Sequence, residues 1–262
     1  MAYLRAIAFI STLTIALIFV APAQWLARRL EWRVQDRIQR LFCRVICAVI
    51  GVQVKARGRL PGDSPRFVVA NHVSWTDIIA LSSLHPFVFL AKSEVASWPV
   101  LGLLAKLQGT VFVERGARTA IPQVNDALTT VLRKGRDVFV FAEGTSSDGS
   151  QVLRFRPAHF AALPDLRDGP GAPGRVTLAP VAIFYTDRGA RTDVGWYGDM
   201  TFLPHLWSLM KRGGVCCHIV CGDAVEVGAT DRKSLAAATE ASVRDLLAEA
   251  ARDFESPASP RR

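Results

Sequence analysis

The chain has 262 residues, half of them hydrophobic, and its 32 Lys and Arg outnumber 23 Asp and Glu to give a formal net charge of +9. This length suits one large domain with an additional segment, and no zinc finger, RNA-binding signature or basic groove with interleaved aromatic residues suggests a nucleic-acid partner. Five irregularly spaced cysteines argue against a disulfide framework, so we expect reduced thiols that face the cytosol. We expect buried thiols rather than a metal site, because Cys43, Cys47, Cys217 and Cys221 lie in apolar runs.

An uncharged stretch of 22 residues, Ala6 to Ala27, follows Arg5 near the start of the chain. It is long enough to cross a bilayer as a helix. A secretory signal is the alternative, with Ala21-Pro22-Ala23 as its small-residue cleavage site. However, six arginines follow from Arg28 to Arg44, and positive charge after an apolar segment resists translocation. We therefore favour an uncleaved anchor in the inner (cytoplasmic) membrane, with the rest of the protein on the cytoplasmic face.

Basic charge is concentrated at this end, because residues 1–59 hold ten Lys and Arg but two Asp and Glu. A basic, hydrophobic end favours a membrane surface that contains anionic lipids. The span Glu31 to Val49 predicts an amphipathic helix at that surface; the alternative is a helix packed on its own domain with a solvated basic face. We assign residues 1–50 to the anchor and this helix. Its two stripes are Arg33, Arg37, Arg40 and Arg44, and Val34, Ile38, Leu41, Val45 and Val49.

From Val52 onward, short apolar runs alternate with helical stretches. This order predicts a single α/β domain over residues 51–254, with a mixed, largely parallel sheet flanked by helices, and a flexible tail at residues 255–262. Because proline cannot donate to a strand ladder, Pro180 is expected to place its strand locally at an edge or bulge. The expected strands are Val52–Ala56, Phe67–Ala70, Phe87–Ala91, Val111–Val113, Val138–Phe141, Thr177–Phe184 and Val215–Val220, and the expected helices are Ile78–Leu84, Pro99–Leu107, Thr119–Lys134, Leu206–Lys211 and Arg232–Phe254.

The stretch Asn71-His72-Val73-Ser74-Trp75-Thr76-Asp77 follows a predicted buried strand and leads into a helix. Strand ends of this kind are where α/β sheets place their chemistry. Four intervening residues let Asp77 turn back to a ring nitrogen of His72, where a carboxylate fixes the tautomer and stabilises the imidazolium. The pair is typical of a general base that activates a hydroxyl. The alternative is a structural contact between the two side chains.

Two later stretches carry further candidates for binding. Gly109 to Arg115 is a strand that ends in a guanidinium, which can grip a phosphate or carboxylate; a solvated charged turn is the alternative. Glu143-Gly144-Thr145 follows another strand, where Glu143 could hold a polar acceptor and the Gly144 N–H could face a developing oxyanion; an ordinary polar turn is the alternative.

Together these stretches resemble the glycerolipid (lysophospholipid) acyltransferase family, typified by 1-acylglycerol-3-phosphate acyltransferase. Order and spacing match over roughly residues 50 to 225. The resemblance implies an αβ acyltransferase domain behind an N-terminal membrane-binding helical motif. The residues that carry it are Asn71-His72-x4-Asp77, Gly109-x2-Phe112-x2-Arg115, Glu143-Gly144-Thr145 and the strand with Pro180.

The resemblance also implies roles for these residues. His72 would deprotonate the acceptor hydroxyl and Asp77 would orient it, with an acyl thioester of acyl carrier protein or coenzyme A as co-substrate and with neither cofactor nor metal. The acceptor would be a lysolipid such as 1-acylglycerol-3-phosphate. The acceptor-binding residues would be Arg115, Glu143, Gly144 and Thr145, and further substrate contacts would come from Asn71, Gly109, Arg154 and Arg156.

The third motif departs from the family pattern. Phosphate-acceptor members usually have Pro before the Glu and Arg after the Thr, where this chain has Ala142 and Ser146. The missing arginine removes a contact that a phosphate acceptor would use, and the stretches 147–156 and 196–200 look like the branch that acylates lyso-ornithine lipids. Two other classes stay open: a membrane-anchored lipid-binding protein without chemistry, and a thioesterase in which His72 activates water.

Overall fold

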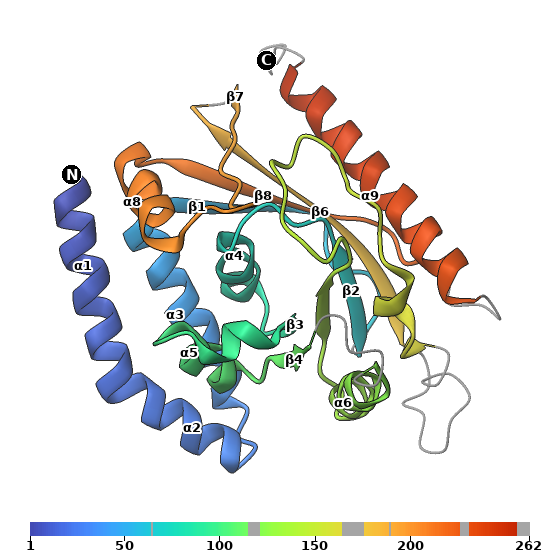
Figure 1. Ribbon diagram of the computed structural model, residues 1–262, viewed down its shortest axis with the longest axis horizontal. Helices are drawn as coiled ribbons and strands as arrows, with labels where there is room; N and C mark the ends of the chain where they lie inside the picture. The colour runs from blue at the N-terminus through green and yellow to red at the C-terminus, as the bar shows by residue number, and fades with distance from the viewer. Residues whose placement is uncertain (64, 115–120, 164–175, 189, 226–230, 256–262) are drawn as a thin grey trace, which may run out of the picture.

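The computed structural model describes residues 1–63, 65–114, 121–163, 176–188, 190–225 and 231–255, which form a central sheet with helices on both faces (Figure 1). The strand order is β1-β8-β6-β2-β5-β3-β4, and β7 pairs with β6. Neighbouring strands are parallel except where β6 meets β8 and β7, so the expected mixed, largely parallel sheet is confirmed. The strands are β1 (Val52–Arg57), β2 (Arg66–Ala70), β3 (Val88–Lys92), β4 (Val111–Val113), β5 (Val138–Phe141), β6 (Thr177–Asp187), β7 (Ala190–Arg191) and β8 (Val215–Cys221).

Helices cover the two faces of the sheet with separate hydrophobic cores. Strand β5 illustrates the division, because Phe139 and Phe141 pack with α3, α4 and α8 while Val138 and Val140 pack with α6 and α9. The protein is therefore a three-layer α/β/α domain. Its helices are α3 (Val34–Ile50), α4 (Thr76–Leu84), α5 (Leu101–Gln108), α6 (Ile121–Arg133), α8 (Phe202–Arg212) and α9 (Arg232–Glu255), with 3-10 turns η2 (Ser93–Ser97) and η4 (Pro157–Phe160).

The N-terminal apolar stretch is one helix that runs through α1 (Ala2–Ile15), the π-helical turn η1 (Ala16–Val20) and α2 (Ala21–Arg29). Its 28 residues are long and apolar enough to cross a membrane, and 6% of its most apolar window is buried. In Figure 1 it runs along the side of the domain, where α1 packs against α3 and α8 and α2 packs against α3 and α5.

Two arginines fasten this helix to the domain, one near each end. The Arg5 guanidinium donates to the carbonyls of Met210 and Gly213 at the end of α8, both at 3.1 Å. The Arg28 Nη1 donates to two carbonyls at the end of α5, at 3.1 and 3.2 Å. Helix C-termini carry partial negative charge, so each guanidinium is attracted as well as hydrogen-bonded. The apolar helix is therefore fixed along the domain rather than projecting from it.

Helix α3 presents three faces rather than the two expected. Its buried residues, among them Cys43, Ile46 and Ile50, pack on the domain. The predicted apolar stripe faces outward, and the exposed fractions of Leu41 and Val45 are 65% and 40%. The helix thus packs on its own domain and still leaves an apolar stripe exposed.

The irregularity expected at Pro180 is confirmed. Strand β6 lies inside the sheet between β8 and β2, but its ladder with β8 ends at the pair Val181–Cys221, and pairing resumes at Leu178–Val225 with one extra residue on the β8 side, which is a bulge. The ladder tolerates the missing N–H because Pro180 lies just past the last β6–β8 pair, Val181 with Cys221. Its carbonyl still accepts a hydrogen bond from the Gly222 N–H at 3.0 Å.

Helix α8 differs from the expectation. It starts at Phe202, four residues before the expected start, because proline is tolerated in the first turn of a helix and Pro204 lies there.

Candidate functional site

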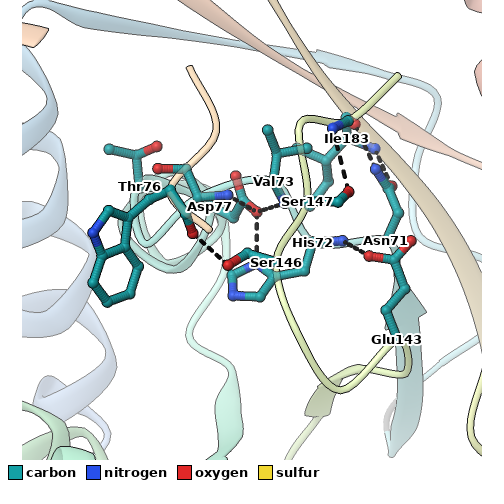
Figure 2. A network of polar contacts seen from close by, with 12 residues as sticks. Asn71, His72, Val73, Thr76, Asp77, Glu143, Ser146, Ser147 and Ile183 are labelled. Carbon is teal, nitrogen blue, oxygen red and sulfur yellow. Dashed lines mark hydrogen bonds and ion pairs between the residues drawn. The ribbon is translucent and has the colours of Figure 1, made fainter. Parts of the chain in front are cut away.

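The site forms where three loops meet at one edge of the sheet. Strand β2 lies between β5 and β6 and is parallel to both. Because parallel strands end at the same edge, the loops after β2, β5 and β6 come together there. In Figure 2, His72 lies between Asp77 on one side and Glu143 on the other. The structure thus brings the first and third sequence motifs into one place.

His72 and Asp77 form the pair that the sequence predicts. The His72 Nδ1 lies 2.8 Å from Asp77 Oδ2, and because a carboxylate accepts, Nδ1 carries the proton. The ring stacks on Phe141 with 3.9 Å between ring centroids, and the side chain is 17% exposed. The second ring nitrogen, Nε2, is left as the acceptor, which is the state a general base requires.

Asp77 is buried in the first turn of α4 and is held by four donors. Its Oδ2 accepts the Val73 and Ser74 backbone N–H groups at 2.8 and 3.0 Å, besides the His72 ring. Its Oδ1 accepts the Tyr185 hydroxyl at 2.5 Å. A carboxylate surrounded by donors is held in one orientation, so Asp77 can stabilise an imidazolium at His72.

Tyr185 is a functional residue that the sequence did not reveal. It is fully buried on β6, and its hydroxyl also lies 2.8 Å from Thr76 Oγ1. Burial, followed by the charge of Asp77, raises the pKa of Tyr185 well above its usual value, so the hydroxyl remains a donor. Val181 pairs with Ala70, which places Tyr185 four residues further on, beside the loop after β2. The contact between Tyr185 and Asp77 depends on the register of β6 against β2, which cannot be read from one sequence.

We predict that Tyr185→Phe lowers kcat about tenfold, the effect of losing one hydrogen bond to a charged group. The measurement is kcat at neutral pH, with the exposed Tyr3→Phe in α1 as the control. A variant whose kcat matches the wild type would remove Tyr185 from the site.

Glu143 holds the backbone of the loop that carries His72. The carboxylate is buried, and its two oxygens accept the His72 backbone N–H at 2.8 Å and the Leu153 backbone N–H at 2.7 Å. Burial raises the pKa of Glu143 to about 7, against these two hydrogen bonds, which favour the ionised form. Because both oxygens are engaged inside the protein, we assign Glu143 to holding His72 in place rather than to contacting the acceptor.

This buried carboxyl predicts a pH-dependent stability. The folded protein binds the Glu143 proton more tightly than the unfolded chain. The contribution of this group to the free energy of unfolding is therefore complete below about pH 4.5 and is lost as the pH rises toward 7. The loss is at most about 3 kcal/mol. Denaturant unfolding in one detergent at pH 5 and pH 8 gives the free energy of unfolding at each pH. Between pH 5 and pH 8 this free energy should fall less for Glu143→Gln than for the wild type. The control, Glu94→Gln, is exposed; equal losses in all three proteins would contradict the prediction.

The rest of the third motif is a turn. The Gly144 N–H donates to the Phe141 carbonyl at 3.0 Å, so it is not aimed at an oxyanion as the sequence suggested. Gly144 has a φ of +71°, and a Cβ there would lie 2.7 Å from the Arg156 Nε, so glycine leaves room for this guanidinium. Thr145, Arg154 and Arg156 are exposed, and the structure brings Arg156 next to the motif.

Two other candidates have structural partners. The Asn71 side chain is buried and exchanges two hydrogen bonds of 2.8 Å with the Ile183 backbone, which ties the end of β2 to β6. Gly109 ends α5 with a φ of +83°, and a Cβ there would lie 2.4 Å from the Arg28 Nη1. We therefore assign Asn71 to the support of the site and Gly109 to the contact between α5 and Arg28, rather than to substrate. Arg115 lies outside the described residues.

The sequence also missed how the loops are joined. The Ser146 hydroxyl donates to the Trp196 carbonyl, and the Trp196 N–H donates to the Val73 carbonyl at 2.9 Å. The Ser147 N–H donates to the His72 carbonyl at 3.0 Å (Figure 2). The residue that replaces the expected arginine thus connects the loop after β5 to the loop after β6.

Within the described part of the chain, no group of three or more His, Cys, Asp or Glu side chains could hold a metal ion. The five cysteines are unpaired, and burial raises the pKa of the Cys43 and Cys47 thiols to about 12. These thiols are therefore inert packing groups at neutral pH.

Comparisons with known proteins agree with this geometry. The family model described as Acyltransferase matches residues 51–184. The chain is 38% identical to the lyso-ornithine lipid O-acyltransferase of Brucella abortus, over 90% of this chain and 91% of that one. It is 36% identical to the 1-acyl-sn-glycerol-3-phosphate acyltransferase of Neisseria gonorrhoeae, over 76% of each.

A solved structure has the same fold. The 1-acyl-sn-glycerophosphate acyltransferase of Thermotoga maritima superposes with a TM-score of 0.66, over 98% of this chain and 97% of that one, at 19% identity. The family match includes both members of the His72–Asp77 pair and the third motif. This chain therefore belongs to the acyltransferase family, and it is an enzyme of the lysolipid O-acyltransferase type.

Proposed function

We propose that this enzyme transfers a fatty acyl chain from a thioester of acyl carrier protein or coenzyme A to the free hydroxyl of a lyso-ornithine lipid. The observation that carries the reaction type is the contact between His72 Nδ1 and Asp77 Oδ2, which leaves Nε2 as a base where three loops meet. Among the described residues, no serine or cysteine side chain is hydrogen-bonded to this base, so we infer direct transfer between the two substrates without an acyl-enzyme.

In this reaction His72 Nε2 takes the proton of the acceptor hydroxyl, and Asp77 stabilises the imidazolium that forms. The hydroxyl oxygen attacks the thioester carbonyl, and a tetrahedral intermediate forms. The intermediate collapses when the C–S bond breaks, and the thiolate receives the proton from the His72 ring. The products are an ester and a free thiol, and the enzyme returns to its starting state.

Two observations favour the lyso-ornithine acceptor. The Brucella abortus relative and a second one from Rhizobium meliloti, 37% identical over 87% of this chain, both bear this name. Ser146 replaces the arginine expected for a phosphate acceptor and is engaged with Trp196. The second candidate is 1-acylglycerol-3-phosphate, which the similarity to the Neisseria gonorrhoeae enzyme favours.

We place the protein on the cytoplasmic face of the inner membrane, with its apolar helix lying in one leaflet. Arg5 and Arg28 hold that helix along the domain, so it can enter the bilayer only together with the domain surface beside it. Its outward side chains, such as Ile7 and Phe19, are 63% and 68% exposed. Exposed arginines of α2 and α3 support contact with anionic lipids.

Purified full-length enzyme, a labelled acyl thioester and a panel of lysolipids test this proposal. We expect diacyl product from lyso-ornithine lipid. Free fatty acid in the presence of every acceptor would indicate a thioesterase, and neither product would indicate a lipid-binding protein. Either result would overturn the assignment.

From the second motif we expect Arg115 to bind the charged part of the acceptor. Arg115→Ala should raise the acceptor KM about tenfold and leave the donor KM within a factor of two. The matched control is Arg133→Ala, an exposed arginine of α6. An acceptor KM that stays at the wild-type value would count against this role.

A further inference from the structure

A groove of about 440 Å³ lies between the loop after β6 and helix α8. One wall is formed by residues 193–201 and the other by α8. Most of its lining surface is apolar, but Asp193, Asp199 and Arg212 place charged side chains near the two ends of α8. Two of its lining residues, Asp199 and Met200, belong to the stretch 196–200 that resembles the lyso-ornithine branch.

This groove borders the catalytic loop directly. Trp75 lies between His72 and Asp77 in the chain, and its Nε1 donates to His205 Nδ1 at 3.0 Å. The Trp196 N–H, next to the lining residue Gly195, donates to the Val73 carbonyl at 2.9 Å. Trp75 and the Val73 carbonyl thus connect the wall of the groove to the loop that carries the base.

The charges of the groove are mixed and incompletely paired. No hydrogen bond or ion pair joins the exposed Asp199 carboxylate to another described residue. The Arg212 Nη1 donates to two neutral acceptors, Thr192 Oγ1 at 3.0 Å and the Asp193 carbonyl at 2.8 Å, so no carboxylate neutralises its charge. The Asp193 carboxylate accepts the Gly195 N–H and the Tyr197 hydroxyl.

His205 adds no positive charge to the groove. Burial lowers the pKa of its imidazole, and its two ring nitrogens already bond with Trp75 and with the Val194 carbonyl. A groove lined by two carboxylates and one guanidinium disfavours a phosphate dianion but matches a ligand that carries one ammonium and one carboxylate.

We propose that this groove binds the zwitterionic amino-acid head group of the acceptor lipid, with Asp199 on its ammonium and Arg212 on its carboxylate. An ornithine acylated on one amino group keeps the other amino group and its carboxylate free, which is the required pair. This assignment rests on the proposed function, since it locates the acceptor of that reaction. It makes Asp199 and Arg212 determinants of acceptor specificity, distinct from the base that performs the transfer.

The test uses purified full-length enzyme in detergent micelles with saturating acyl thioester. Three acceptors are compared: lyso-ornithine lipid, its N-acetylated form without the ammonium, and its methyl ester without the carboxylate. For the wild type we expect each modified acceptor to have a KM about tenfold higher. Asp199→Asn should raise the KM for the unmodified lipid about tenfold with no further loss on N-acetylation. Arg212→Gln should behave in the same way toward the methyl ester.

Controls and outcomes separate the two proposals. Lys211→Gln, the neighbouring cation on α8, and Asp245→Asn, exposed on α9, should retain the wild-type preference. Equal KM values for the three acceptors with the wild type would overturn the groove assignment, and so would variants that change all three KM values alike or none. If the wild type makes no diacyl product from any acceptor, the proposed function fails and the groove assignment fails with it.

Discussion

Replacing His72 by alanine should lower kcat about 1,000-fold or more while the protein remains folded. We propose that the imidazole is the base that accepts the hydroxyl proton, and general-base catalysis contributes factors of about 100 to 10,000. The side chain is partly exposed and its principal packing contact is the ring of Phe141, so its loss removes little buried surface. The measurement is the initial rate of diacyl lipid formation, with far-UV circular dichroism and the thermal midpoint recorded for the same sample.

The chain offers a matched control for this variant. His85 Nε2 pairs with the buried Asp137 at 2.7 Å, so the protein contains a second His–Asp pair. It lies before β3 and β5, at the amino ends of these strands, on the opposite edge of the sheet from the site. His85→Ala should therefore lower stability and leave kcat unchanged. Equal activity of His72→Ala and the wild type would end the assignment of His72 as the base.

Local patterns in the sequence carried the prediction of the catalytic pair. The apolar run before Asn71 marks the end of a buried strand, and the spacing from His72 to Asp77 is short enough for one turn to bring the two side chains together. Both features depend on neighbours along the chain, which is why they are visible without a structure. The expected strands were confirmed for the same reason.

The supports of that pair could not be predicted, because they depend on contacts between distant strands. Tyr185 reaches Asp77 through the pairing of β6 with β2, and Glu143 reaches the His72 N–H through the pairing of β5 with β2. A glutamate in a polar turn gives no sign that it is buried. Its expected contact with the acceptor came from its sequence neighbours, whereas its position comes from the sheet.

The same distinction explains Ser146 and the groove beside α8. As a missing arginine, Ser146 indicated that the phosphate-type motif is incomplete. Its contact with Trp196 shows that the residue also has a positive role, because it joins the two loops that frame the site. Specificity in this protein thus combines the absence of one cation with the presence of Asp199 and Arg212 in a neighbouring groove.

Asp77→Asn should lower kcat about 1,000-fold although the side chain keeps nearly the same shape. If the amide oxygen replaces Oδ2, it can still accept from His72 and the two backbone N–H groups, and the amide NH₂ can donate to Tyr185, whose hydroxyl then donates to Thr76. The hydrogen bonds survive in this arrangement but the negative charge does not, so the imidazolium loses its stabilisation. If the amide turns the other way, its NH₂ faces His72 Nδ1 and selects the wrong tautomer.

Both orientations give the same kinetic result, and two measurements identify its cause. The thermal midpoint should change by a few degrees, because three backbone and ring contacts remain. The acceptor and donor KM values should stay within about a factor of two, because Asp77 is buried and touches neither substrate. Asp137→Asn, the equivalent change in the pair at the other edge of the sheet, should destabilise the protein and spare kcat. A large rise in either KM with unchanged kcat would mean that Asp77 shapes a binding site and does not assist the base.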